Sequence, residues 1–72
     1  MTVQDLRDLS SKLPVVMTRK DVEKHFGGLY TTGYLANLDS EKKGPKKGRI
    51  GRKVVYKSDD FIEWLIARLS EA

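Results

Sequence analysis

The length of the chain is its strictest constraint, because 72 residues leave room for one small domain with one core. Few residues then remain to enclose a substrate cavity, which usually measures roughly 300 Å³ or more. The sequence contains no cysteine, so disulfides, thiolate metal sites and cysteine nucleophiles are excluded. We therefore expect a single hydrophobic core and no enzymatic activity.

The basic residues gather in one stretch of the sequence. Eight of the 14 Lys and Arg residues lie between Lys42 and Lys57, with no acidic residue among them. The rest of the chain carries six basic and ten acidic residues, although the net charge of the whole is +4. This asymmetry is typical of a protein that presents one face to a polyanion. If these basic residues are considered alone, the alternative interpretation is a solvated basic loop.

Targeting and membrane signals are not evident in the sequence. Residues 1–5 lack the basic start and apolar run of a signal peptide. No apolar stretch approaches the roughly 20 residues of a membrane span. We expect a soluble, cytoplasmic and nucleoid-associated protein with no membrane partner, no cofactor and no small-molecule substrate.

The N-terminal segment is expected to form a helix or an arm. Leucines recur at helical spacing over 2–13, and Pro14 ends the pattern because the residue before a proline avoids the helical region. The apolar run 15–17 that follows predicts a short strand. We therefore separate an N-terminal segment, 1–14, from the domain that spans 15–72.

Two short helices joined by a tight glycine turn are expected next. Thr18-x-x-Asp21 resembles a capping box and predicts the start of the first helix, which Gly27-Gly28 ends. The second helix is expected over 31–40, beginning at Thr31 or Thr32 and ending at Asp39 or Ser40. Such a pair is typical of a helix-turn-helix.

The second of these helices has two unlike faces. Leu35 and Leu38 share the face expected to meet the core. The opposite face is small and polar, consisting of Gly33, Ala36, Asn37 and Ser40. Small residues would let the backbone approach DNA closely, and Asn37 is suited to hydrogen-bond an adenine edge. An ordinary surface helix is the alternative.

A β-hairpin that turns near Gly51-Arg52 is expected after the Gly44-Pro45 loop. Strand alternation places Val54 and Tyr56 on one face, and we expect Ile50 to join them from the other strand. The basic residues at the turn would make this hairpin the wing of a winged helix-turn-helix.

The last helix is expected to begin after Ser58 as its cap, with Asp59 and Asp60 in a first turn that favours acids. Its apolar stripe consists of Phe61, Ile62, Leu65, Ile66 and Leu69. Trp64 lies at the edge of that stripe, and we expect it to pack with the core rather than to contact a partner.

Three stretches together resemble a known family. They are residues 17–22 with their capping threonine, 34–39 followed by Gly44-Pro45, and 49–56 followed by 58–65. In this order and spacing the chain, from 16 to 69, resembles the MerR-like winged helix-turn-helix of phage excisionases and AlpA-type prophage regulators.

The resemblance implies a mainly α fold with a small β-hairpin, a winged helix-turn-helix. It also implies binding of double-stranded DNA, with the second helix in the major groove and the basic wing on the minor groove. The role would be that of an excisionase-like architectural factor in recombination or of a small transcription regulator. The candidate DNA-binding residues are Thr31, Thr32, Tyr34 and Asn37 in the second helix, Lys46, Lys47, Arg49, Arg52 and Lys53 in and before the wing, and Lys20 in the first helix.

Two positions depart from the family pattern. Thr31-Thr32-Gly33 stands where the family often has an arginine, so the commonest base contact, arginine to guanine, is missing from this helix. Val55 occupies an outward wing position that is often polar or charged. It is either a lone exposed valine or a contact between copies on DNA, and a recombinase is the other expected protein partner. Tyr34 could also pack at the helix edge with its hydroxyl at a phosphate.

Other functions are the alternatives to DNA binding. A protein-interaction module with a basic docking surface and no DNA binding is the main one. An enzyme is not expected, because His25 is the only histidine and the acids at 59–60 are explained by helix capping. No phosphate-binding loop or metal-ligand cluster is evident in the sequence.

Overall fold

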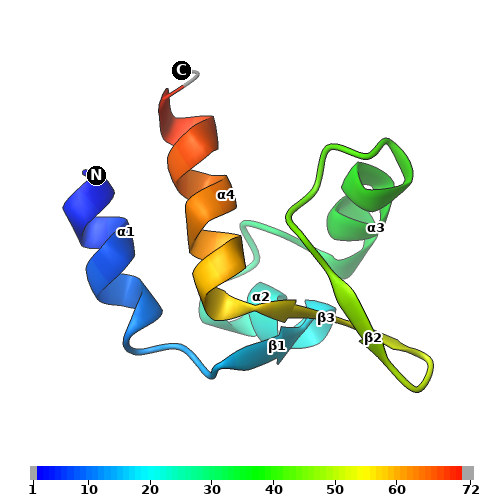
Figure 1. The fold of residues 1–72 in the computed structure, drawn as a ribbon. Coiled ribbons are helices and arrows are strands. Elements are labelled where there is room, and N and C mark those ends of the chain that lie inside the picture. Colours follow the sequence, from blue (N-terminus) through cyan, green and yellow to red (C-terminus); the bar gives the residue numbers. More distant parts are fainter. Residues whose placement is uncertain (1, 71–72) are drawn as a thin grey trace.

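The computed structural model describes residues 2–70, as four helices and a three-stranded antiparallel sheet (Figure 1). The helices are α1 (Val3–Ser10), α2 (Arg19–His25), α3 (Thr32–Ser40) and α4 (Ser58–Ser70). The strands are β1 (Val16–Thr18), β2 (Gly48–Ile50) and β3 (Lys53–Lys57). The expected hairpin is formed by β2 and β3, and a third strand joins it. The architecture is therefore a small α+β fold rather than a mainly α fold with a hairpin alone.

The sheet has the strand order β1-β3-β2. Its core face carries Met17 opposite Tyr56, and both side chains are fully buried. The expected strand at 15–17 is confirmed as β1, which pairs with β3 because it delivers Met17 to the core. The other side of the sheet, called the outer face below, carries the residues that alternate with these, namely Val16, Thr18, Gly48, Ile50, Lys53, Val55 and Lys57.

Ile50 lies on the outer face, so the expectation that it joins Val54 and Tyr56 was wrong. Only two residues, 51 and 52, separate β2 from β3, and this places Ile50 opposite Lys53. Directly opposed residues share a face, and a shift of one residue in register exchanges the two faces. As a result Ile50 is 66% exposed, and Arg49 takes the place opposite Val54 on the core face.

Threonine caps start three of the helices. Thr18 Oγ1 accepts from the Asp21 backbone N–H at 3.2 Å, and the Asp21 carboxylate accepts from the Thr18 backbone N–H at 3.0 Å. This reciprocal pair confirms the predicted capping box. The same box, formed by Thr2 with Asp5, starts α1, and Thr31 caps α3.

The connection between α2 and α3 is longer than the tight turn expected. It spans residues 26–31, whereas a helix-turn-helix usually has a turn of about 3–4 residues. Gly27, with φ of 60°, ends α2, and Gly28 N–H donates to Glu23 O at 2.9 Å. The glycines therefore stop the helix as predicted. The extra length is used by Tyr30, whose ring packs against the core.

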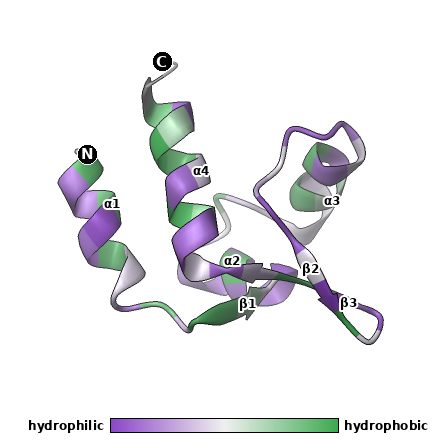
Figure 2. Cartoon of the chain, in the orientation of Figure 1, coloured by the Kyte–Doolittle hydropathy of each residue, from purple (hydrophilic) through white to green (hydrophobic). Residues whose placement is uncertain are grey.

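One core holds the four helices and strands β1 and β3 together. Its buried residues are Leu6, Met17, Val22, Leu35, Tyr56, Phe61, Ile62 and Leu65. Purple and green alternate along α1 and α4, which pack together through their apolar stripes (Figures 1 and 2). α1 ends at Ser10, short of the predicted residue 13, and Leu6 belongs to the common core. Trp64 packs against this core, as expected.

No helix among residues 2–70 is long and apolar enough to cross a membrane.

Candidate nucleic-acid interface

α3 presents the two faces that its sequence predicts. Leu35 is fully buried and Leu38 is 6% exposed, so this side is anchored in the interior. On the opposite side Gly33, Asn37 and Ser40 are exposed and Ala36 is half-buried. No side chain on that outward face is longer than asparagine, which leaves a low surface along the helix.

Asn37 and Gly33 are the two informative positions on this low surface. The Asn37 amide makes no side-chain hydrogen bond within the described residues, so its donors and acceptor are free. A Cβ placed on Gly33 would meet no atom within 4 Å, so the space above the helix is open. The surface can therefore approach a flat partner closely with one polar group at its centre.

Of the other candidates in and beside α3, Thr31 and Tyr34 have side chains that make structural contacts, whereas Thr32 is bonded through its backbone. Thr31 Oγ1 accepts from the Tyr34 backbone N–H at 3.1 Å, and Thr32 N–H donates to Glu23 Oε1 at 3.3 Å. The Tyr34 ring stacks on Tyr30 at 5.9 Å between ring centroids. Its hydroxyl accepts from Arg68 Nη2 at 3.4 Å. Tyr34 thus packs at the edge of α3 beside α4.

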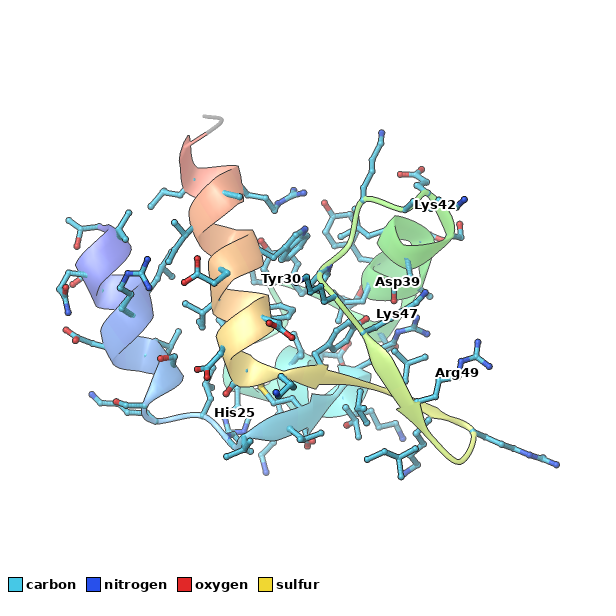
Figure 3. All side chains as sticks on the ribbon, viewed as in Figure 1. His25, Tyr30, Asp39, Lys42, Lys47 and Arg49 are labelled. Atoms are coloured by element: carbon cyan, nitrogen blue, oxygen red, sulfur yellow. The ribbon has the colours of Figure 1, made fainter. Side chains whose placement is uncertain are left out.

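The hairpin carries Arg49 on the side of the sheet that faces α3 and Arg52 at its turn. Arg49 lies opposite Val54 on the core face, and Tyr56 on the same face reaches Asp39 in α3. In Figure 3 the Arg49 side chain projects from β2 on the side of the molecule that carries α3. Arg52 is exposed at the hairpin turn. The hairpin therefore places Arg49 on the same side of the sheet as α3, and Arg52 at its turn.

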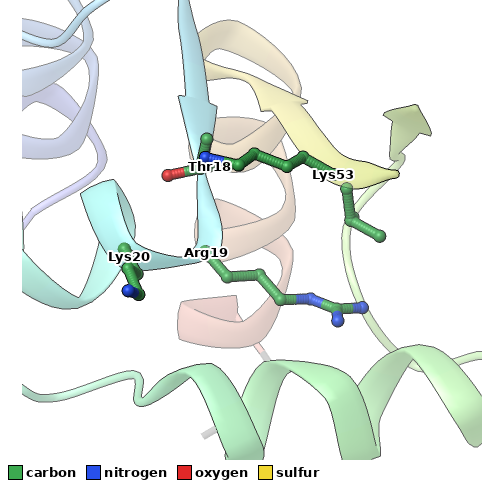
Figure 4. A pocket seen from close by; sticks show the side chains of 5 residues that line it. Thr18, Arg19, Lys20 and Lys53 are labelled. Carbon is green, nitrogen blue, oxygen red and sulfur yellow. The ribbon is translucent and has the colours of Figure 1, made fainter. Parts of the chain in front are cut away.

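Lys20 and Lys53 lie around a shallow groove between the start of α2 and the hairpin. The groove measures about 220 Å³ and is lined by Thr18, Arg19, Lys20, Lys53 and Val54 (Figure 4). Both lysines are exposed. The structure thus brings Lys20 from the first half of the chain next to the basic stretch of the second half.

Lys46 and Lys47 lie elsewhere. Together with Lys57 they surround a second groove, on the outer face of the sheet. The basic stretch is therefore divided by the hairpin between two sides of the sheet. Sequence reasoning treated these lysines and the two arginines as a single surface.

A polar cluster beneath the interface connects α2, α3 and β3. The Tyr56 hydroxyl donates to Asp39 Oδ2 at 2.8 Å and accepts from Arg19 Nε at 3.3 Å. Arg19 Nη2 forms an ion pair with the same Asp39 oxygen at 2.6 Å. The Asp39 side chain is only 4% exposed. Because a buried carboxylate is costly without partners, this cluster holds α3 in position against the hairpin.

The protonation states of Tyr56 and Arg19 suit this role. Burial raises the pKa of the Tyr56 hydroxyl, so the group stays protonated at neutral pH and remains a donor. Hydrogen bonds to Tyr56 and Asp39 raise the pKa of the Arg19 guanidinium above its ordinary value. These two groups therefore keep their charge states throughout the physiological range.

The loop after α3 is fitted to the same cluster. A Cβ on Gly44 would collide with the Asp39 carboxylate, so only glycine allows this close approach. Trp64 Nε1 donates to Lys43 O at 2.9 Å, which ties the loop to α4. The Gly44-Pro45 segment therefore sets the path of the chain from α3 into the hairpin.

Arg19 and Asp39 were not identified from the sequence, although a signal was present. Arg19 begins α2 and Asp39 lies in the last turn of α3, so each charge opposes the dipole of its own helix. Two charges at unfavourable helix ends indicate that each has a partner. The pairing between them could not be read from the spacing alone.

Comparison of the chain with protein-family models, characterised proteins and solved structures found no match. Within residues 2–70, no group of three or more His, Asp or Glu side chains is placed to hold a metal ion. The shape and charge of the surfaces described above are therefore the basis for assigning a function.

Proposed function

We propose that this chain binds duplex DNA as a winged helix-turn-helix protein, similar to the phage excisionases and AlpA-type regulators that its sequence resembles. In this proposal α2 and α3 form the helix-turn-helix, and the hairpin β2–β3 is the wing. One observation carries the proposal: α3, with its low polar face, lies on the same side of the sheet as Arg49 of the hairpin. The buried cluster of Arg19, Asp39 and Tyr56 supports it, because the cluster holds these two parts together.

α3 is proposed to enter the major groove with its low face toward the bases. Gly33 and Ala36 allow the helix backbone to come close, and Asn37 pairs with the N6 and N7 groups of an adenine. With one such side chain at the centre of the face, direct readout is confined to few base pairs. Further selectivity then comes from the shape and deformability of the DNA.

The wing is proposed to lie along the adjacent backbone and minor groove. Arg49 and Arg52 are suited to phosphates and to a narrow minor groove, and Lys20 and Lys53 are suited to phosphates between helix and wing. Engagement of about four phosphates, one for each of these cations, predicts a slope of log affinity against log salt concentration of roughly −4.

Salt titrations of binding to a random-sequence duplex test this proposal. We expect Arg49→Ala and Arg52→Ala each to weaken binding and to reduce the steepness of the salt slope by about 0.9, the value of one phosphate contact. The matched control is Lys12→Ala, which removes one exposed charge near the end of α1 and leaves binding unchanged. Absence of binding at low salt, or an equal loss in the control, would contradict the proposal.

The two roles within the proposal differ in what they do to DNA. An architectural factor bends its site, whereas a regulator can bind without a large bend. Electrophoretic mobility of complexes with the site at the middle or at the end of a fragment measures this bend. A strong dependence of mobility on position supports the excisionase-like role, and its absence supports the regulator role.

A further inference from the structure

The outer face of the sheet is an apolar strip in a protein whose core lies on the other side. Val16 is 42% exposed, Ile50 is 66% exposed and Val55 is half-buried. The three residues come from three different strands, so the register of the sheet assembles the strip. Lone exposed apolar residues are ordinary, but three brought together around one groove form a patch.

The patch is concave because one of its residues, Gly48, has no side chain. Gly48 lies opposite Val55, and without a Cβ it leaves the side of Val55 open. The resulting groove measures about 210 Å³ and has Val16, Ile50 and Val55 in its lining. A Cβ added to Gly48 would meet Val55 Cγ2 at 3.8 Å, an ordinary contact, so the opening is not required for close packing.

The border of the groove is strongly positive. Lys46, Lys47 and Lys57 line it, and Asp60 is the only acidic residue that does. None of the three lysines forms an ion pair with any residue in the described part of the chain. The groove therefore combines an apolar floor with unpaired cations at its edge.

We propose that this outer face is a docking surface for a partner protein, which it binds through an acidic segment carrying a bulky apolar side chain. The apolar side chain fills the groove between Val16, Ile50 and Val55, while acidic neighbours pair with the lysines. Charge complementarity selects an acidic segment, since a second copy that met this surface through its own outer face would bring like charge to the lysines. The apolar floor separates this surface from a phosphate-binding one, because phosphates gain nothing from aliphatic side chains.

The position of the surface permits both interactions at once. Arg49 and α3 lie on the core-face side of the sheet, and the groove lies on the opposite side. Of the proposed wing contacts only Lys53, opposite Ile50, shares the outer face with the groove, although it does not line it. A protein that binds DNA through the first side can therefore hold an acidic partner through the second. The docking surface stands on its own geometry and remains in place if the DNA proposal fails.

Two labelled peptides of equal negative charge test the docking surface. One carries leucine between its glutamates and the other carries serine at the same positions. We expect the full chain to bind the leucine peptide about tenfold more tightly, the effect of burying one aliphatic side chain. Amide shifts in a nuclear magnetic resonance titration should centre on Val16, Ile50 and Val55. Equal binding of the two peptides would overturn the proposal, as would shifts centred elsewhere.

Two variants should each abolish the preference for the leucine peptide over the serine peptide. Ile50→Ser removes an apolar wall, whereas Gly48→Val fills the groove, and both leave the charge unchanged. Because both positions are exposed, the fold should survive, which amide spectra will verify. Leu29→Ser is the control, since Leu29 is 69% exposed in the α2–α3 connection and does not line the groove. A preference that persists in both groove variants would refute the proposal.

A duplex DNA added to the peptide complex separates this proposal from the DNA proposal. We expect the peptide to stay bound, and Gly48→Val to bind duplex like the wild type. Displacement of the peptide by the duplex would overturn the assignment of a separate surface. Weakened DNA binding in Arg52→Ala with unchanged peptide binding would support it.

Discussion

Lys42 has a backbone conformation that suits glycine better than lysine. Its φ is 60°, and its N–H donates to Asp39 O at 3.1 Å in the turn that ends α3. A residue with a Cβ is disfavoured in this left-handed region by about 1–2 kcal/mol. Glycine in turn costs about 0.5–1 kcal/mol, because it loses more backbone entropy on folding than other residues do. The net effect of Lys42→Gly should be a rise of about 0.5–1 kcal/mol in the free energy of unfolding, measured with urea. The control Lys43→Gly removes the same charge at an ordinary conformation and should destabilise the fold.

A substitution at Gly33 can distinguish the effect of this position on the stability of α3 from its proposed effect on DNA binding. A methyl group at this position meets open space, so Gly33→Ala should raise the free energy of unfolding by about 0.5–1 kcal/mol through helix propensity. If the helix backbone lies close to the bases, the same methyl group should weaken binding to duplex DNA. Unfolding and binding measured on one sample check both effects. A variant that is more stable and binds DNA as tightly as the wild type would speak against close approach at this point.

At the scale of elements, the capping boxes link helix stability to pH. Hydrogen bonding from the Thr18 backbone N–H lowers the pKa of Asp21. A carboxyl whose pKa is lower in the folded state contributes stability that is complete above its unfolded pKa, near about 4, and is lost as pH falls through the folded value. Asp21→Asn should therefore lower the free energy of unfolding by about 1 kcal/mol at pH 7, with the difference narrowing below about pH 4.

The control for this prediction is Asp59→Asn. It removes an acid from the first turn of α4, where the carboxylate makes no hydrogen bond to residues 2–70. It should lose only the favourable interaction of an exposed acid with the helix dipole, about 0.3 kcal/mol, so its deficit at pH 7 should be well below that of Asp21→Asn. An Asp21→Asn variant with an undiminished deficit at pH 3 would show that the capping box is not the cause.

The elements were largely predictable because their signals are local. A threonine followed three residues later by an aspartate, a glycine pair and a two-residue turn each act within a few positions, and α2, α3 and the hairpin follow them closely. The failures concern how elements meet. Ile50 was placed on the wrong face because sheet register depends on the exact length of the turn. The length of the α2–α3 connection was not predicted, because it depends on the packing of Tyr30 against Phe61 and Trp64 of α4, which are distant in the sequence.

At the scale of the whole molecule, the candidate interface depends on contacts that no short motif encodes. Arg19 and Asp39 are twenty residues apart, and Tyr56 joins them from a further seventeen. The positive charge of the hairpin and the small polar face of α3 could each be identified from the sequence, but their relative position could not. The cluster determines their relative position, since it is the polar contact shared by α2, α3 and β3 among the described residues.

A double-mutant cycle on this cluster tests whether it positions the interface. Tyr56→Phe keeps the buried ring and removes one hydroxyl, so it should cost about 1 kcal/mol of unfolding free energy. Asp39→Asn leaves Arg19 without its countercharge and should cost more, about 2 kcal/mol. Because the two residues share one oxygen, their effects should fall short of additivity by about 0.5–1 kcal/mol.

The decisive measurement adds duplex affinity to the same cycle, under conditions where every variant is folded. If the cluster holds α3 against the wing, both single variants should weaken DNA binding although neither residue is exposed to it. Arg7→Gln is the control, because it breaks the exposed ion pair between α1 and Glu63, which is worth less than about 1 kcal/mol. Its affinity for DNA should equal that of the wild type. Unchanged affinity in Tyr56→Phe and Asp39→Asn would mean that α3 and the wing find their places on DNA without the cluster.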